Sequence, residues 1–141
     1  MKELEYPFDA AYIIKKRKSL KKALLADGTS RIRKKIAVFG GSTTSDIVKT
    51  LELFLLDAGI EPEFYESEYA QYFQDAMFPD ETLLSFKPDI VFIHTTNRNV
   101  TDWPEMTDTT EQIDEKLHTE INRFTAMWKS IAEKFHCPII Q

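Results

Sequence analysis

Hydroxyl-bearing residues follow a short apolar run in the first third of the chain. The run over 35–39 is rich in β-forming residues and ends on two glycines, and four hydroxyl residues, Ser42 to Ser45, come directly after it. Apolar residues at helical spacing then continue to Gly59, so the pattern predicts a strand, a tight turn and a helix. At such a turn Ser42 lies beside the free N–H groups and positive end of the helix, where a hydroxyl can be activated or an oxyanion or phosphate can be held. The alternative is that these hydroxyls only cap the helix.

A second polar loop follows the apolar run that ends at His94. In a parallel sheet with the strand order 2-1-3-4, the loops after the first and third strands meet where the order reverses. We therefore expect Ser42 and the side-chain amide of Asn97 to lie within about 8 Å of each other. An Asn amide can donate a hydrogen bond to the oxyanion that forms when a Ser nucleophile attacks a carbonyl group. His94 ends the third strand near this crevice, where it is either a base or a satisfied polar end of the strand.

Other polar and aromatic residues are candidates for binding at the same crevice. They are Gly41, Thr43, Tyr69, Gln71, Tyr72 and Arg98. The aromatic ones follow the second predicted strand in a segment without clear periodicity, so the alternative is that they pack in the core. No metal site is predicted, because His118 and His136 share a face of one helix but lie about 27 Å apart, too far to bind one ion.

Strands and helices alternate along the chain. We predict strands near 35–39, 61–66, 88–94 and 138–141 and helices near 9–26, 44–58, 79–86 and 109–136. This alternation predicts an α/β fold with a doubly wound parallel sheet, a three-layer α/β/α arrangement and a flavodoxin-like strand order. The last helix has the most regular pattern, because its apolar residues recur every three or four positions: Ile113, Leu117, Ile121, Phe124, Trp128, Ile131 and Phe135.

The chain divides by charge as well as by pattern. Residues 1–34 are predicted to form a basic helix and linker, and residues 35–141 the front part of an α/β domain. The net charge is −5, yet residues 1–35 carry +7 and residues 36–141 carry −12. Three interpretations of the basic segment stay open: a solvated helix face, a dock for an acidic protein, and a nucleic-acid site, which is disfavoured because no aromatic residues interleave with the charges. In the first interpretation five side chains turn inward: Ile13, Ile14, Arg17, Leu20 and Leu24.

The composition predicts a cytoplasmic protein that contacts neither membranes nor nucleic acid. Cys137 is the single cysteine, so no internal disulfide forms. No apolar run approaches the roughly 18 residues that cross a bilayer, and the first residues do not resemble a signal peptide. The strand over 138–141 has no covering helix after it, so we expect a larger parent domain and self-association through the open edge or face.

Two blocks resemble the SGNH (GDSL-like) hydrolases. The stretch Gly40-Gly41-Ser42-Thr43 after a strand is similar to their Ser-bearing block, and Thr95-Thr96-Asn97-Arg98 falls where they carry a Gly-x-Asn-Asp block. More of the chain resembles the N-terminal SGNH-like domain of FkbH-like proteins. The similar segments are 35–44, 53–56, 64–69, 88–96 and 138–141, together with the start Tyr6-Pro7-Phe8.

The FkbH-like resemblance implies a function in acyl carrier chemistry. In that family a haloacid-dehalogenase (HAD)-like phosphatase domain, which is expected to use Mg²⁺, follows the first domain. Members load a glyceryl group from a phosphorylated three-carbon acid onto an acyl carrier protein, or serve polyketide and surface-polysaccharide pathways. The resemblance implies no cofactor for the present chain itself.

The SGNH resemblance implies a hydrolytic site that is altered here. Ser42 would be the nucleophile, with Asn97 and the backbone N–H of Ser42 as the oxyanion hole. Gly41 stands in place of the usual Asp, Thr95 and Arg98 replace the Gly and Asp of the second block, and no Asp-x-x-His pair, which would supply the base, follows within the chain. A Ser hydroxyl without a base is a weak nucleophile.

Two hypotheses follow from these resemblances. In the first, the intact domain is a serine esterase or acyltransferase whose base lies beyond residue 141. In the second, the crevice binds an acyl carrier protein or its phosphopantetheine arm, and the chemistry occurs elsewhere. The retained Ser and Asn favour the first hypothesis and the substitutions favour the second. Under either hypothesis, the chain by itself is expected to be inactive.

Overall fold

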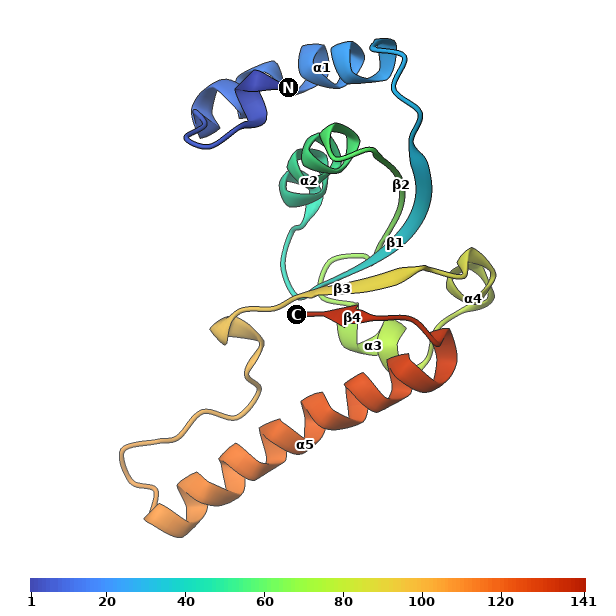
Figure 1. Ribbon diagram of the computed structural model, residues 1–141. Helices are drawn as coiled ribbons and strands as arrows, with labels where there is room; N and C mark the ends of the chain where they lie inside the picture. Colours follow the sequence, from blue (N-terminus) through green and yellow to red (C-terminus); the bar gives the residue numbers. More distant parts are fainter.

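The computed structural model describes residues 1–141 as an α/β fold around one parallel sheet (Figure 1). The four strands lie in the order β2-β1-β3-β4, and all neighbouring pairs are parallel. Their bounds are Ile32–Gly40 for β1, Ile60–Glu66 for β2, Ile90–His94 for β3 and Ile139–Ile140 for β4. The predicted α/β class, parallel sheet and strand order are therefore confirmed.

Helices cover both faces of the sheet (Figure 1). Helix α2 packs on one face, and helices α3 and α5 pack on the other. Helix α1 packs on α2 and forms an outer layer there. The helices are α1 (Ala10–Ala26), α2 (Ser45–Asp57), α3 (Tyr72–Met77), α4 (Glu81–Phe86) and α5 (Thr110–Phe135), with short 3₁₀ turns η1 (Lys2–Leu4) and η2 (Asn97–Asn99).

Strand β1 forms the centre of the core because both of its faces are buried. Alternate side chains of a strand point to opposite faces of the sheet. Ala37 and Phe39 accordingly pack with α3, α5 and β3, whereas Ile36 and Val38 pack with α2. This burial on both sides explains why the strand is a continuous apolar run, as is typical of central strands in parallel sheets.

Helix α5 begins at a capping box formed by Thr109 and Gln112. Only its second half packs on the sheet, where Met127 and Ile131 are fully buried. The first half projects beyond the sheet (Figure 1), and Leu117 and Ile121 there are 55% and 51% exposed. The apolar periodicity predicted the helix, but it does not show how far the sheet extends beneath it.

Three sequence-based expectations about local structure were wrong. Strand β1 begins at Ile32, three residues earlier than predicted, because it pairs with β2 over seven residues. The segment after β2 was expected to be aperiodic, but it contains the short helix α3. In α1, Ile13, Leu20 and Leu24 are buried as predicted, whereas Ile14 does not turn inward and is 57% exposed.

Candidate functional site

The loops that follow β1 and β3 lie side by side at the carboxyl end of the sheet. Gly40 at the end of β1 is in register with His94 at the end of β3, and the Gly41 N–H donates a hydrogen bond to the His94 carbonyl oxygen over 2.8 Å. This is the point where the strand order reverses, and ligands of open α/β sheets bind at such points. The predicted meeting of the two loops is therefore present in the structure.

Ser42 faces His94 rather than the end of helix α2. Its Oγ lies 3.4 Å from His94 Nδ1, and its side chain is half-buried. The N-cap residue of α2 is Thr44, whose hydroxyl makes no capping bond and instead donates to Glu66 Oε2 over 3.1 Å. The capping interpretation is thus wrong for Ser42, whose hydroxyl contacts the His94 ring instead.

Asn99, not Asn97, joins the second loop to the first. Asn99 Nδ2 donates to the Gly41 carbonyl oxygen over 2.9 Å, and Asn99 Oδ1 accepts from the Thr96 N–H over 2.8 Å. Asn97 is exposed, and its side-chain amide makes no hydrogen bond. The two asparagines are only two positions apart in the sequence, and the 3₁₀ turn η2 determines which side-chain amide points at the Ser42 loop.

Gly41 has no room for a side chain. A Cβ atom at this position would overlap the side-chain amide of Asn99. At the neighbouring Gly40, a Cβ atom would lie 2.6 Å from Thr44 Cγ2 and 2.8 Å from the Ser42 carbonyl oxygen. An Asp at position 41, which the SGNH resemblance implies, would therefore require the Asn99 side chain to move.

The other predicted binding residues are dispersed. Thr43 and Arg98 are exposed on the two loops, and Tyr69 and Gln71 are exposed before α3. Tyr72 was expected in a loop that lines the crevice, but it lies in α3 and is buried in the core. Tyr72 therefore serves packing, which was the alternative interpretation, whereas Tyr69 is 74% exposed.

A charged network behind the crevice escaped the sequence analysis. Arg123 of α5 donates to the Asn99 carbonyl oxygen over 2.7 Å, to Tyr72 Oη over 3.1 Å and to Glu120 Oε2 over 2.8 Å. Its guanidinium also lies over the rings of Phe73 and Phe124, at 5.4 and 4.6 Å from their centroids. Glu120 and Arg123 lie three positions apart on one helix, so in the sequence they cannot be distinguished from an ordinary surface ion pair.

Glu120 is held ionised by this network. The hydrogen bonds from Arg123, and then those from the hydroxyl and N–H of Thr101, lower the pKa of Glu120 from 4.5 to about 2. The side chain is buried, and burial alone would raise its pKa. The network therefore fixes the loop after β3 to helix α5, and through Asn99 it supports the Ser42 loop.

The polar groups at the crevice make an incomplete catalytic set. An imidazole beside a Ser hydroxyl can act as its base, provided that a third group orients the ring. No carboxylate is hydrogen-bonded to His94. No group of three or more His, Cys, Asp or Glu side chains is placed to bind a metal ion, and none of the helices has the length and apolar character needed to cross a bilayer.

Comparison with known proteins gives a relationship at the level of the fold. No protein-family model and no curated protein matches the chain. The structure resembles the crystal structure of the N-terminal part of the protein BF1531 from Bacteroides fragilis, which contains a phosphatase domain and is complexed with Mg, with a TM-score of 0.65 and 19% identity. The likeness covers 87% of the present chain and 31% of that chain, so the chain spans about a third of that structure's length. The two proteins therefore share a fold over this part.

Proposed function

We propose that the chain is the N-terminal SGNH-like domain of an FkbH-like protein, and that it recognises an acyl carrier protein or its acyl or glyceryl group for a HAD-like phosphatase domain. Two independent lines support this proposal. The sequence blocks around Ser42 and Asn97 resemble that family, and the fold resembles the N-terminal part of a protein that contains a phosphatase domain. In this proposal the HAD-like phosphatase domain carries out the chemical step of the FkbH-like protein.

The observation that carries the proposal is the meeting of the loops after β1 and β3 at the carboxyl end of the sheet. Ser42 Oγ and the His94 ring face each other there over 3.4 Å, and the Asn99 amide holds the two loops together. Both side-chain groups can hydrogen-bond a carbonyl or hydroxyl oxygen, as found in acyl and glyceryl groups. Loops that are held in place at the ends of strands can bind such a group without being reordered.

A serine esterase or acyltransferase is the second candidate, and the same contact favours it. His94 Nδ1 is within reach of the Ser42 hydroxyl, so it is a candidate base inside the chain. In this candidate Ser42 is the nucleophile, and its N–H contributes to the oxyanion hole, with Asn97 as the second donor that the sequence predicts. The base is either His94 or the His of an Asp-x-x-His pair beyond residue 141. The lack of a carboxylate on His94 favours binding over turnover.

Binding and turnover can be measured on the same samples. We expect glyceryl-loaded acyl carrier protein to shift the amide resonances of 40–44 and 95–99, and expect Ser42→Ala and His94→Ala to weaken the binding severalfold. Ser85→Ala, at an exposed position on α4, is the matched control and should leave the binding unchanged. Hydrolysis of p-nitrophenyl acetate should stay at background. Turnover that Ser42→Ala and His94→Ala both abolish would establish the esterase instead, and an absence of shifts at both loops would refute the binding proposal.

A further inference from the structure

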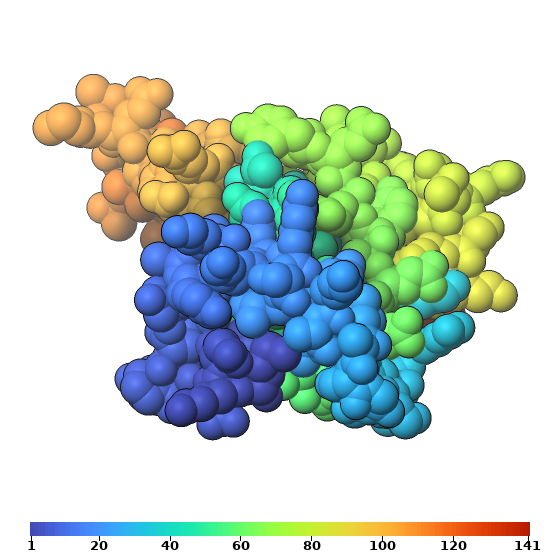
Figure 2. All heavy atoms as spheres, turned by 90° about the horizontal axis from the view of Figure 1, so that it is seen from above, coloured from blue at the N-terminus to red at the C-terminus, as the bar shows by residue number.

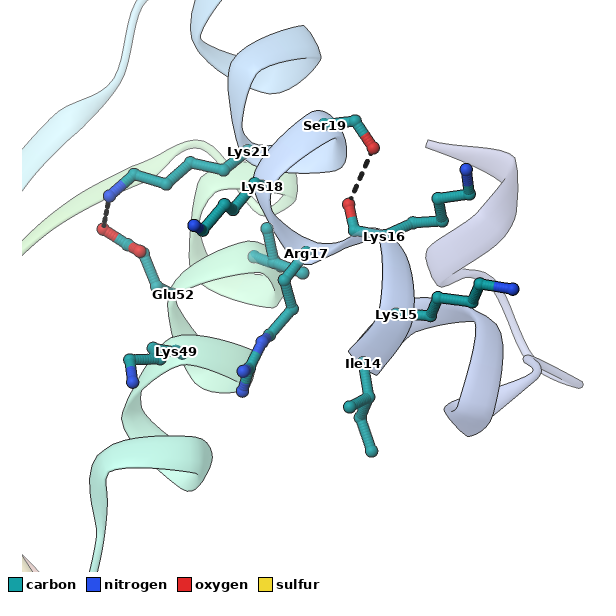
Figure 3. Close-up of a pocket in the computed structure, with 10 residues that line it drawn as sticks. Ile14, Lys15, Lys16, Arg17, Lys18, Ser19, Lys21, Lys49 and Glu52 are labelled. Carbon is teal, nitrogen blue, oxygen red and sulfur yellow. Dashed lines mark hydrogen bonds and ion pairs between the residues drawn. The ribbon is translucent and has the colours of Figure 1, made fainter.

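A basic hollow lies between helices α1 and α2 (Figure 3). Its volume is about 600 Å³, and six cationic side chains line it: Lys15, Lys16, Arg17, Lys18, Lys21 and Lys49. Only two of them are neutralised by ion pairs, Arg17 with Asp46 over 2.7 Å and Lys21 with Glu52 over 2.7 Å. The other four form no ion pair, so the hollow keeps a net positive charge on a chain whose net charge is −5.

An apolar hollow adjoins the basic one. Its volume is about 450 Å³, and its apolar lining consists of Ile14, Ile47, Leu51 and Phe54. Ile14, which the sequence predicted to turn inward, lines both hollows and is 57% exposed. The surface between α1 and α2 therefore presents apolar side chains next to unpaired lysines. We call this combined surface the α1–α2 face.

The chemistry of the α1–α2 face selects among polyanionic partners. A nucleic acid offers phosphates but would leave the apolar hollow unfilled, and the remaining surface, with −12 over 36–141, would repel a long polyanion. An amphipathic helix with carboxylates beside apolar side chains matches both hollows. Helices recognised in grooves use such apolar anchors, while the surrounding charges steer the encounter.

We propose that the α1–α2 face docks an acidic amphipathic helix of a partner protein. Resting on the proposed function, we further assign this partner as the acyl carrier protein. The position of the face supports the assignment, because Arg17 of α1 pairs with Asp46 in the first turn of α2. Asp46 is four residues from Ser42, so their Cα atoms are at most about 14 Å apart. Figure 2 shows α1, in blue, beside the teal start of α2.

The test compares a carrier protein with and without its phosphopantetheine arm. We expect apo carrier to bind the chain at about 0.05 M salt and to dissociate largely at about 0.5 M salt, because exposed charges are screened. Lys15→Glu combined with Lys18→Glu should weaken this binding about tenfold, since each exposed ion pair contributes a few-fold. Ile14→Gln should weaken it severalfold while leaving the salt dependence intact. Fluorescence anisotropy of labelled carrier gives the affinities.

Controls separate docking at the face from recognition at the crevice. Lys87→Glu with Lys129→Glu changes the net charge equally, and both lysines are exposed and without ion pairs, so apo binding should stay within about twofold. If holo carrier binds more tightly than apo carrier and Ser42→Ala removes this difference, the phosphopantetheine arm is recognised at the Ser42 loop. If holo and apo carrier bind equally, the proposed recognition at Ser42 is refuted, but docking at the α1–α2 face is not. The docking proposal would be overturned if apo carrier did not bind, or if both pairs of charge variants lost affinity equally. It would also be overturned if RNA or anionic vesicles, rather than carrier, bound in a way that depends on Lys15 and Lys18.

Discussion

Replacing Glu120 by Gln should make the stability of the chain less dependent on pH. The pKa of Glu120 is about 2 in the fold against an ordinary 4.5, because Arg123 and Thr101 hydrogen-bond its carboxylate. A depressed pKa stabilises the fold above the unfolded value, and this contribution is lost as the pH falls from 4.5 toward 2. The full shift corresponds to at most about 3 kcal/mol at pH 7, and solvent screening reduces the expected value to about 1–2 kcal/mol.

Urea unfolding of the wild type and of Glu120→Gln across pH 7 to 3 measures this difference. The difference in the free energy of unfolding should be about 1–2 kcal/mol at pH 7 and should fall to less than half of that by pH 3. Glu133→Gln, at an exposed position of the same helix without an ion pair, should change stability by less than about 0.5 kcal/mol at every pH. A Glu120→Gln difference that stays constant with pH would show that the carboxylate charge does not anchor the loop.

Further predictions concern the Ser42 loop and helix α5. Asn99→Ala should cost about 1–3 kcal/mol in urea unfolding, because the Gly41 carbonyl oxygen and the Thr96 N–H lose their partner, whereas Asn97→Ala should cost less than about 0.5 kcal/mol. Gly41→Ala should lower the free energy of unfolding by about 1–3 kcal/mol, because its methyl group would overlap the Asn99 side chain, and by much less in the Asn99→Ala background. If the effects of the two substitutions were additive, Gly41 and Asn99 would not be in contact. Leu117→Gln, at a 55% exposed position of α5, should preserve stability. If the expected self-association uses this uncovered apolar face rather than the open edge of β4, the substitution should reduce it in sedimentation, whereas raising salt from about 0.1 to 1 M should not.

The sequence predicted the sheet because its strands are distinctive. Parallel strands buried on both faces appear as apolar runs, and the regular helices between them imply crossover connections. The predicted strand order then implied that the loops after β1 and β3 meet, and this gave the position of the candidate site. These inferences need only local periodicity and general rules of topology, so a single sequence is sufficient for them.

Local periodicity and topology do not predict which side chains contact each other at the candidate site. Asn97 and Asn99 are equally polar in the sequence, and only the backbone of η2 directs Asn99 at Gly41. The contact of Arg123 with the Asn99 carbonyl oxygen joins residues 24 positions apart and leaves no local pattern. Likewise, the periodicity of α5 defines an apolar face but carries no information about where the sheet beneath it ends.

The Ser42 loop is supported from two directions, and this bears on how the domain would work. On one side, Asn99 joins Gly41 to the loop that Arg123 fixes to α5. On the other side, Asp46, at the start of the helix that follows Ser42, is paired with Arg17 of the outer helix α1. A loop held in this way is preorganised, so a ligand at Ser42 would not bear the full entropic cost of ordering it. A partner bound on the α1–α2 face would contact the same support through Arg17.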